Sequence, residues 1–144
     1  MSDTSQIEAI AHRWHTEVAC QGQLDLVDQI LDPDVVVHIA GSPDVHGVVG
    51  AKQFVEGLRS AFPDFAVQHE DTVAGGDRVA VRWRWQGTNL GELNGMPATG
   101  KHAEGPGTDF YHFRNGKIIE MWIMPDNFAT FQQLGLISLP APTG

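Results

Sequence analysis

Hydrophobic positions change their spacing along this chain, from a helical period in the first half to strict alternation in the second. After a capping box at Ser5-Gln6-Ile7-Glu8, apolar residues recur every three or four positions, which predicts an amphipathic helix. β-Branched residues then form a continuous run at 35–40, which is typical of a strand. The first half therefore predicts helices at 5–21, 24–31 and 51–61, a strand at 35–40 and a loop at 41–50.

The second half alternates apolar and polar residues, most clearly in the segment 78–88. Two strands joined at Asn115-Gly116 form the strongest local hairpin signal in the chain. The predicted elements are strands at 65–73 and 78–88, a loop-rich segment at 89–106 with a candidate strand edge at 101–103, the hairpin and a helix at 128–134. Helices followed by strands are the order of an α+β domain with helices on one face of an antiparallel sheet. A curved sheet of this kind encloses a cone-shaped cavity, and 144 residues suit one domain spanning 1–144.

The register of the hairpin determines which side chains face that cavity. With a three-residue loop at 114–116, Asp109 is the one acid on an apolar face shared with Tyr111, Ile119, Met121 and Ile123. A buried acid needs partners or a chemical role, so Asp109 is a candidate catalytic residue and Tyr111 a candidate hydroxyl donor. It can equally be a structural acid bonded to Tyr, Trp or backbone amides.

A second acid–base pair, His112 with Asp126, is rejected by the same register. His112 falls on the opposite face of the hairpin, and Asp126 follows Pro125 at a position suited to capping the last helix.

Composition and charge exclude several classes of protein. A formal charge of −9 argues against nucleic acid and against anionic membrane surfaces. The local basic strip at Arg78, Arg82 and Arg84 alternates with apolar residues and is expected on the solvated or interface face of its strand. Cys20 is the only cysteine, which favours a cytoplasmic location. The histidine spacings and the glycine-rich segments match no metal or phosphate motif, so we expect neither a metal nor another cofactor.

Several local strings together resemble those of one known family. They are FPDF at Phe62, GDRVAVRW at Gly76, GTNLGELNGMPATGK at Gly87, NGKIIEMW at Asn115 and QQLG at Gln132. In this order they resemble the SnoaL-like polyketide cyclases of the nuclear transport factor 2-like superfamily. The resemblance implies an α+β barrel with a deep apolar pocket, a homodimer formed through the open sheet face, and ring closure on a small, mostly apolar polyketide.

The resemblance also sets an expectation that this chain does not meet. Aldol cyclases of the family pair a His on the penultimate strand with an Asp on the last strand, and these positions fall on Asp109 and Ile123. Aldol closure needs a base to remove a proton from carbon, which Ile123 cannot do. We therefore expect a cofactor-independent cyclase controlled by substrate shape, such as a [4+2]-type closure, in which Asp109 and Tyr111 orient the substrate.

Other candidate residues follow from their places on the predicted elements. His38 in the strand VVVHIA is a candidate base, or else a strand-end histidine bonded to backbone. Glu70 lies on the strand that supplies carboxylates in epoxide-opening relatives, or else is solvated at a strand edge. The expected pocket walls and mouth comprise Trp14, His15, Trp83, Trp85, Asn89, Met121 and Ile123.

Two alternative functions remain open from the sequence. One is a carboxylate-based epoxide hydrolase/cyclase or isomerase, and the other is a non-catalytic module that binds apolar ligands. The glycine and proline content of 96–107 predicts a mobile lid over the cavity.

Overall fold

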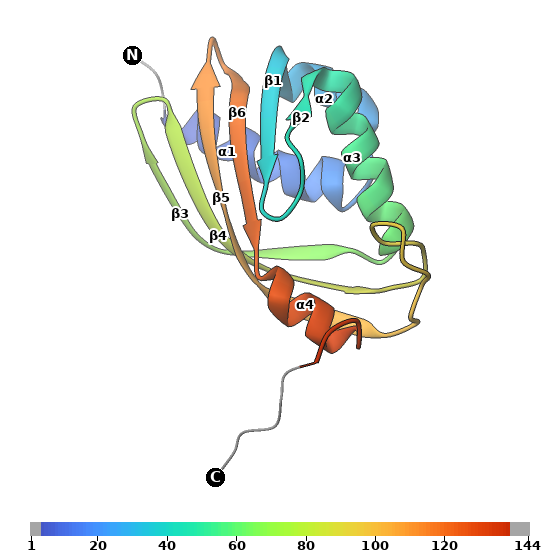
Figure 1. Ribbon diagram of the computed structural model, residues 1–144. Coiled ribbons are helices and arrows are strands. Elements are labelled where there is room, and N and C mark those ends of the chain that lie inside the picture. The colour runs from blue at the N-terminus through green and yellow to red at the C-terminus, as the bar shows by residue number, and fades with distance from the viewer. Residues whose placement is uncertain (1–3, 139–144) are drawn as a thin grey trace.

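A computed structural model describes residues 4–138 and shows one curved, six-stranded sheet wrapped around helices (Figure 1). The strand order is β2-β1-β6-β5-β4-β3. All neighbours are antiparallel except β1 and β6, which run parallel. The elements are α1 (Thr4–Arg13), a π-helical turn (Trp14–Ala19), a 3-10 turn (Leu24–Leu26), α2 (Val27–Ile30), β1 (Leu31–Ile39), β2 (Val45–His46), α3 (Gly47–Ala61), β3 (Ala66–Gly75), β4 (Arg78–Thr88), β5 (His102–Arg114), β6 (Lys117–Pro125) and α4 (Asn127–Gln133). The predicted α+β class is confirmed.

The first helix changes its winding where it meets the sheet. After Arg13 the chain continues as one π-helical turn, which closes with the Cys20 amide donating to the His15 carbonyl at 2.8 Å. Wider turns of this kind insert an extra residue and rotate the side chains that follow. Both Trp14 and His15 are buried on this turn. Gly22, at φ +70°, then lets the chain reverse toward α2.

The hairpin has a tighter turn than the sequence pattern suggested. Arg114 pairs with Lys117, so the loop is the two-residue Asn115-Gly116, and both residues have positive φ as a type I′ turn requires. The extra residue is a bulge at Ile119, because His112 faces Glu120 while Phe113 faces Ile118.

The bulge restores the predicted faces beyond the turn. Asp109 lies opposite Ile123, and Tyr111 lies opposite Met121. Next to the turn, Ile118 takes the inward place predicted for Ile119, because Ile118 is fully buried while Ile119 is partly exposed.

The segment predicted as a mobile lid is partly a central strand. Residues 102–107 form the first half of β5, where Ala103, Gly105 and Gly107 are buried. Gly105 and Gly107 pair with Trp85 and Trp83 of the neighbouring strand β4. A Cβ on Gly107 would lie 2.2 Å from the Trp83 ring. Gly107 therefore accommodates the Trp83 ring. The lid prediction is wrong for 102–107, and the loop prediction is wrong for 104–106.

The inward and outward faces of the sheet otherwise follow the alternation in the sequence. In β4, Val79, Val81, Trp83 and Trp85 are buried. The basic strip Arg78, Arg82 and Arg84 is exposed, as expected. Helix boundaries differ more, because α3 begins at Gly47 and β1 begins at Leu31. Within residues 4–138 no helix has the length and apolarity needed to cross a membrane.

Candidate active site

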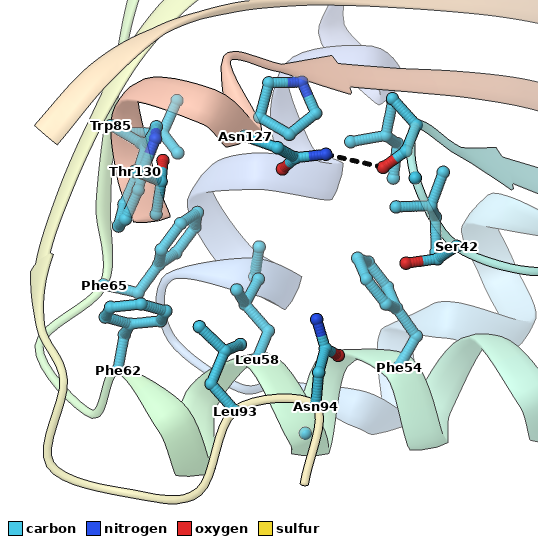
Figure 2. Close-up of a pocket in the computed structure, with 18 of the residues that line it drawn as sticks. Ser42, Phe54, Leu58, Phe62, Phe65, Trp85, Leu93, Asn94, Asn127 and Thr130 are labelled. Carbon is cyan, nitrogen blue, oxygen red and sulfur yellow. Dashed lines mark hydrogen bonds between the residues drawn. The ribbon is translucent and has the colours of Figure 1, made fainter. Parts of the chain in front are cut away.

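A cavity of about 460 Å³ lies between the concave face of the sheet, the π-helical turn, α3, residues 92–94 and α4. Figure 2 shows Phe54 and Leu58 of α3 pointing into it. Phe62, Phe65 and Trp85 form an aromatic cluster at one end, with Phe62 edge-on to Trp85. Most of the wall is apolar, while the polar groups in it include Ser42, Gln53, Glu92, Asn94 and Asn127. A cavity of this size and character suits a small, largely apolar molecule with a few oxygen atoms.

The most buried polar group in the wall is the Asp109 carboxylate. Its Oδ2 atom lies 2.6 Å from His15 Nε2 and accepts a hydrogen bond from the Tyr111 hydroxyl, also at 2.6 Å. Asp109 and Tyr111 are fully buried, and His15 is 4% exposed. The π-helical turn thus brings His15 onto a carboxylate that lies 94 residues away in the chain. Asp109 is therefore one member of a His–Asp–Tyr cluster, rather than the single polar group expected from the sequence.

Two further histidines extend this cluster toward the edge formed by α1 and β3. His15 Nδ1 lies 2.8 Å from His69 Nε2. The His69 ring stacks on His12 with centroids 4.3 Å apart, and His12 Nε2 lies 2.7 Å from the Thr72 hydroxyl. A bulge at Glu70 shifts the register of β3 and places His69 opposite Trp83.

Burial sets the proton affinity of two groups in the cluster. It raises the pKa of Tyr111 well above its ordinary value, with help from the Asp109 charge and hydrogen bond, so the hydroxyl stays protonated and donates. Burial also lowers the pKa of His69 to about 4, and the neighbouring His15 and His12 act in the same direction. His69 is therefore neutral near pH 7.

Three buried side-chain atoms within residues 4–138 have no hydrogen-bond partner: Asp109 Oδ1 and the indole nitrogens of Trp83 and Trp85. All three residues lie in the cavity wall. A buried polar atom without a partner costs about 1–3 kcal/mol. The arrangement thus offers one free acceptor and two free donors beside the same cavity.

Six of the expected site and pocket residues line the cavity: Trp14, His15, Trp83, Trp85, Asp109 and Ile123. Tyr111 and Met121 are fully buried without being part of the lining, and Tyr111 reaches the site through its bond to Asp109. His15, expected at the mouth, lines the cavity and is also the direct partner of Asp109.

The structure places three other candidates outside the cavity lining. His38 alternates to the outer face of β1, where it contacts Glu120 at 2.6 Å and Asp44 at 3.0 Å and stacks on Trp122. Its inward orientation was therefore predicted wrongly, because the neighbouring Ile39 takes the inward place.

Glu70 and Asn89 have local structural contacts. Glu70 is exposed at the β3 bulge and lies 3.4 Å from Arg82. Asn89 is fully buried, and its side chain bonds the backbone of Ala61, Gly91 and Thr99, which fastens the loop before β5.

The rejected pair, His112 and Asp126, has the positions that the register predicted. His112 lies 3.0 Å from Asp77 on the outer face, and the Asp126 carboxylate accepts from the Ala129 amide at the start of α4.

Sequence reasoning missed His69 and the direct contact of His15 with Asp109. One local signal was present, since His69 and Val67 share a face of β3 two residues apart. The i, i+3 spacing of His12 and His15 places both rings on the side of the first helix that meets β3. Within residues 4–138 no group of three or more His, Cys, Asp or Glu residues has an arrangement that could hold a metal ion.

The fold and the site together define a small α+β protein whose curved sheet encloses an apolar cavity with a buried His–Asp–Tyr cluster. The sequence profile of the SnoaL-like polyketide cyclases matches residues 9–134, and the chain belongs to this family. It is 29% identical over 120 residues to the aklanonic acid methyl ester cyclase DnrD of Streptomyces peucetius, covering 81% of this chain and 78% of that protein. The family and this relative identify the protein as an enzyme of the cyclase type.

Solved structures share this fold. A SnoaL-like polyketide cyclase structure from Jannaschia sp. CCS1 superposes with a TM-score of 0.87 at 24% identity, covering 96% of this chain and 98% of that one. A polyketide cyclase structure from Acidithiobacillus ferrooxidans has a TM-score of 0.80 at 30% identity, covering 96% and 100%.

Proposed function

We propose that this enzyme closes a carbocyclic ring on a polyketide-type intermediate by proton transfer at Asp109, without a cofactor. The proposal rests on the different contacts of the two carboxylate oxygens of Asp109. Oδ2 is held by His15 and Tyr111, while Oδ1 has no partner beside the cavity. A general base needs a carboxylate oxygen that is free to accept a proton, and Oδ1 has no other partner among the described residues.

The proposed step conserves every atom of the substrate. Asp109 Oδ1 removes a proton from a carbon between two carbonyl groups. The resulting enolate carbon attacks another carbonyl group, farther along the same substrate chain. The new C–C bond pushes the carbonyl electron pair onto oxygen, and that oxygen takes the proton back from Asp109. His15 and Tyr111 steady the carboxylate throughout.

The unpartnered indole nitrogens support a substrate with carbonyl groups. Trp83 and Trp85 both present an N–H that no protein atom accepts. Indole nitrogen donates only, so its complement in a ligand is an acceptor such as a ketone or ester oxygen.

The test uses aklanonic acid methyl ester, the substrate in the name of the Streptomyces relative. Replacing Asp109→Asn keeps the shape and removes the base, so kcat should fall by roughly 10²–10⁴-fold. Activity of Asp109→Asn equal to that of the wild type would overturn the acid–base proposal.

A second candidate, shape-controlled closure of the [4+2] type, is favoured by the aromatic and aliphatic character of most of the wall. It predicts that a linear polyene cyclises faster with the protein than in buffer, and that Asp109→Asn retains this acceleration. The two-carboxylate epoxide route has less support, because Glu70 pairs with Arg82 away from the cavity lining.

We also propose that the enzyme is a cytoplasmic homodimer that buries the outer face of the sheet. Phe110 is 36% exposed and Met124 is 48% exposed on neighbouring strands of that face. Sedimentation of wild type and Phe110→Glu tests this, with a monomeric wild type as the contrary result.

A further inference from the structure

The three histidines beside the active site form a continuous contact path from the cavity wall to the edge of α1 and β3. His15 is almost fully buried, whereas His69 and His12 are partly exposed. The path consists of the 2.8 Å contact between His15 Nδ1 and His69 Nε2, followed by the stacked ring of His12. The cyclisation step proposed above does not use His69 or His12, so their alignment needs its own explanation.

With Asp109 ionised and His15 neutral, the two contacts of His15 determine where each proton lies. An ionised Asp109 can only accept, so His15 donates to it from Nε2. A neutral imidazole carries one N–H, and His15 Nδ1 is then an acceptor. The only proton that can lie in the contact with His69 is therefore the Nε2 proton of His69. His69 Nδ1 carries none in this state.

The same contact must reverse when His15 becomes positively charged. Imidazolium donates from both nitrogens, so His15 Nδ1 then donates and His69 Nε2 must accept. A neutral His69 can do this if its own proton lies on Nδ1. A charged His69 cannot, because both of its nitrogens would then carry protons. Burial, with the charges of His15 and His12, lowers the pKa of His69 to about 4, which keeps the ring neutral.

We propose that His69 is a proton relay and positioning residue for His15. A proton from solution binds His69 Nδ1 while the proton on His69 Nε2 passes to His15 Nδ1. One proton enters, His15 gains a positive charge and His69 remains neutral in its other tautomer. The reverse sequence returns the proton to solution. In this way the buried His15–Asp109 pair exchanges protons with water on the side of α1 and β3, away from the substrate cavity.

The titratable neighbours of His69 are compatible with this direction of transfer. His12 on α1 and His15 on the π-helical turn oppose a positive charge on His69, and Asp109 on β5 favours one more weakly. Thr72, on the same strand, holds His12 Nε2 at 2.7 Å and keeps its ring stacked on His69. His12 thus limits the charge on the relay without bonding to it.

The first experiment follows the histidine side-chain nitrogens of the substrate-free protein by ¹⁵N NMR across pH. His15 resonances are assigned by their loss in His15→Gln, and those of His69 by their loss in His69→Gln. As His15 gains its proton, the protonated nitrogen of His69 should change from Nε2 to Nδ1. If His69 keeps the Nε2 proton while His15 titrates, or becomes charged at the same pH, the proposal is overturned.

The second experiment compares His69→Leu with His69→Gln. Glutamine can still donate or accept by rotating its amide, whereas leucine can do neither. In His69→Leu the NMR titration midpoint of His15 should move about one pH unit lower, because one hydrogen bond to the charged form is lost. His69→Gln should restore most of this shift. His112→Leu removes a partly exposed histidine from the outer face and should leave the midpoint unchanged.

Turnover of aklanonic acid methyl ester separates this inference from the proposed function on which it rests. His69→Leu should lower kcat by about tenfold and change the pH–rate profile, while His69→Gln stays near wild type. An equal loss in both variants, with an unmoved His15 titration, would make His69 merely structural and overturn the relay. If the tautomer change occurs but Asp109→Asn is fully active, the relay stands and the acid–base mechanism fails.

Discussion

Two histidines in this protein hold a carboxylate oxygen at the same distance and have opposite surroundings. His15 Nε2 lies 2.6 Å from Asp109 inside the cavity wall, and His38 Nε2 lies 2.6 Å from Glu120 on the outer face of the sheet. The inner side chains are 5% and 1% exposed, and the outer ones 30% and 35%. Hydrogen-bond length alone therefore does not distinguish a candidate catalytic pair from a surface ion pair.

The difference lies in what else each carboxylate meets. Asp109 has a second donor in Tyr111 and an unpartnered oxygen beside a cavity. Glu120 is partly exposed to solvent, and its partner His38 stacks on Trp122. Burial makes the inner pair costly to break, whereas water replaces either partner of the outer pair at little cost.

The largest expected contrast is in catalysis. Asp109→Asn should lower kcat by roughly 10²–10⁴-fold, and Glu120→Gln should leave it within about twofold of wild type. Steady-state kinetics on aklanonic acid methyl ester measures both. Comparable losses in the two variants would remove the functional distinction between the inner and outer pairs.

The next contrast is in stability. His15→Leu leaves a buried carboxylate with one donor fewer, and we expect a loss of about 3 kcal/mol in the free energy of unfolding. His38→Leu should change it by about 1 kcal/mol or less. Urea unfolding at pH 7 provides the measurement, and similar losses at the two positions would contradict the role assigned to burial.

The inner cluster should also weaken the protein in acid. The folded-state pKa of His69 is lowered to about 4, so below its ordinary value near 6.5 the unfolded chain binds a proton that the folded protein refuses. Stability should therefore fall as the pH drops from about 6.5 to 4, and His69→Gln should reduce that fall. Melting temperatures across this range test it, and parallel curves for the two proteins would speak against it.

The outer pair should produce the smallest effect, with the opposite sign. The hydrogen bond to Glu120 raises the pKa of His38, with Asp44 contributing, so the folded protein binds this proton more tightly than the unfolded chain. The stabilisation is complete below pH 6.5 and is lost as the pH rises through the raised pKa. The melting-temperature difference between wild type and His38→Gln should shrink from pH 5.5 to pH 8.5. A difference that grows over this range would reverse the assignment.

The local pattern was sufficient for the faces of the strands but not for the partners across the cavity. Strict alternation in 78–88 indicated that Trp83 and Trp85 point inward, and the structure agrees. The contact between His15 and Asp109 joins residues 94 positions apart, so no periodicity within either element could indicate it. The π-helical turn that rotates His15 toward the sheet has no strong sequence signature either.

Glycine and proline were misleading where tertiary packing outweighs local preference. Gly105, Pro106 and Gly107 have the composition of a loop, yet they form a central strand beside two indole rings. Pro106 is tolerated near the point where β6 ends, and its carbonyl accepts from the Asp126 amide at 3.2 Å. Similarly, Asn-Gly correctly predicted the turn, while the compensating bulge at Ile119 depended on burying Ile118.

The pairing of two tryptophans with two glycines bears on how this cavity could change during evolution. The Trp83 ring is close-packed over backbone at Gly107, and Trp85 is paired with Gly105, so the residue of β5 directly opposite each tryptophan has no side chain. A smaller residue at position 83 or 85 would therefore deepen the cavity down to the strand itself without displacing a neighbouring side chain. A single substitution at position 83 or 85 would then change the size of substrate that the cavity accepts, while the sheet keeps its shape.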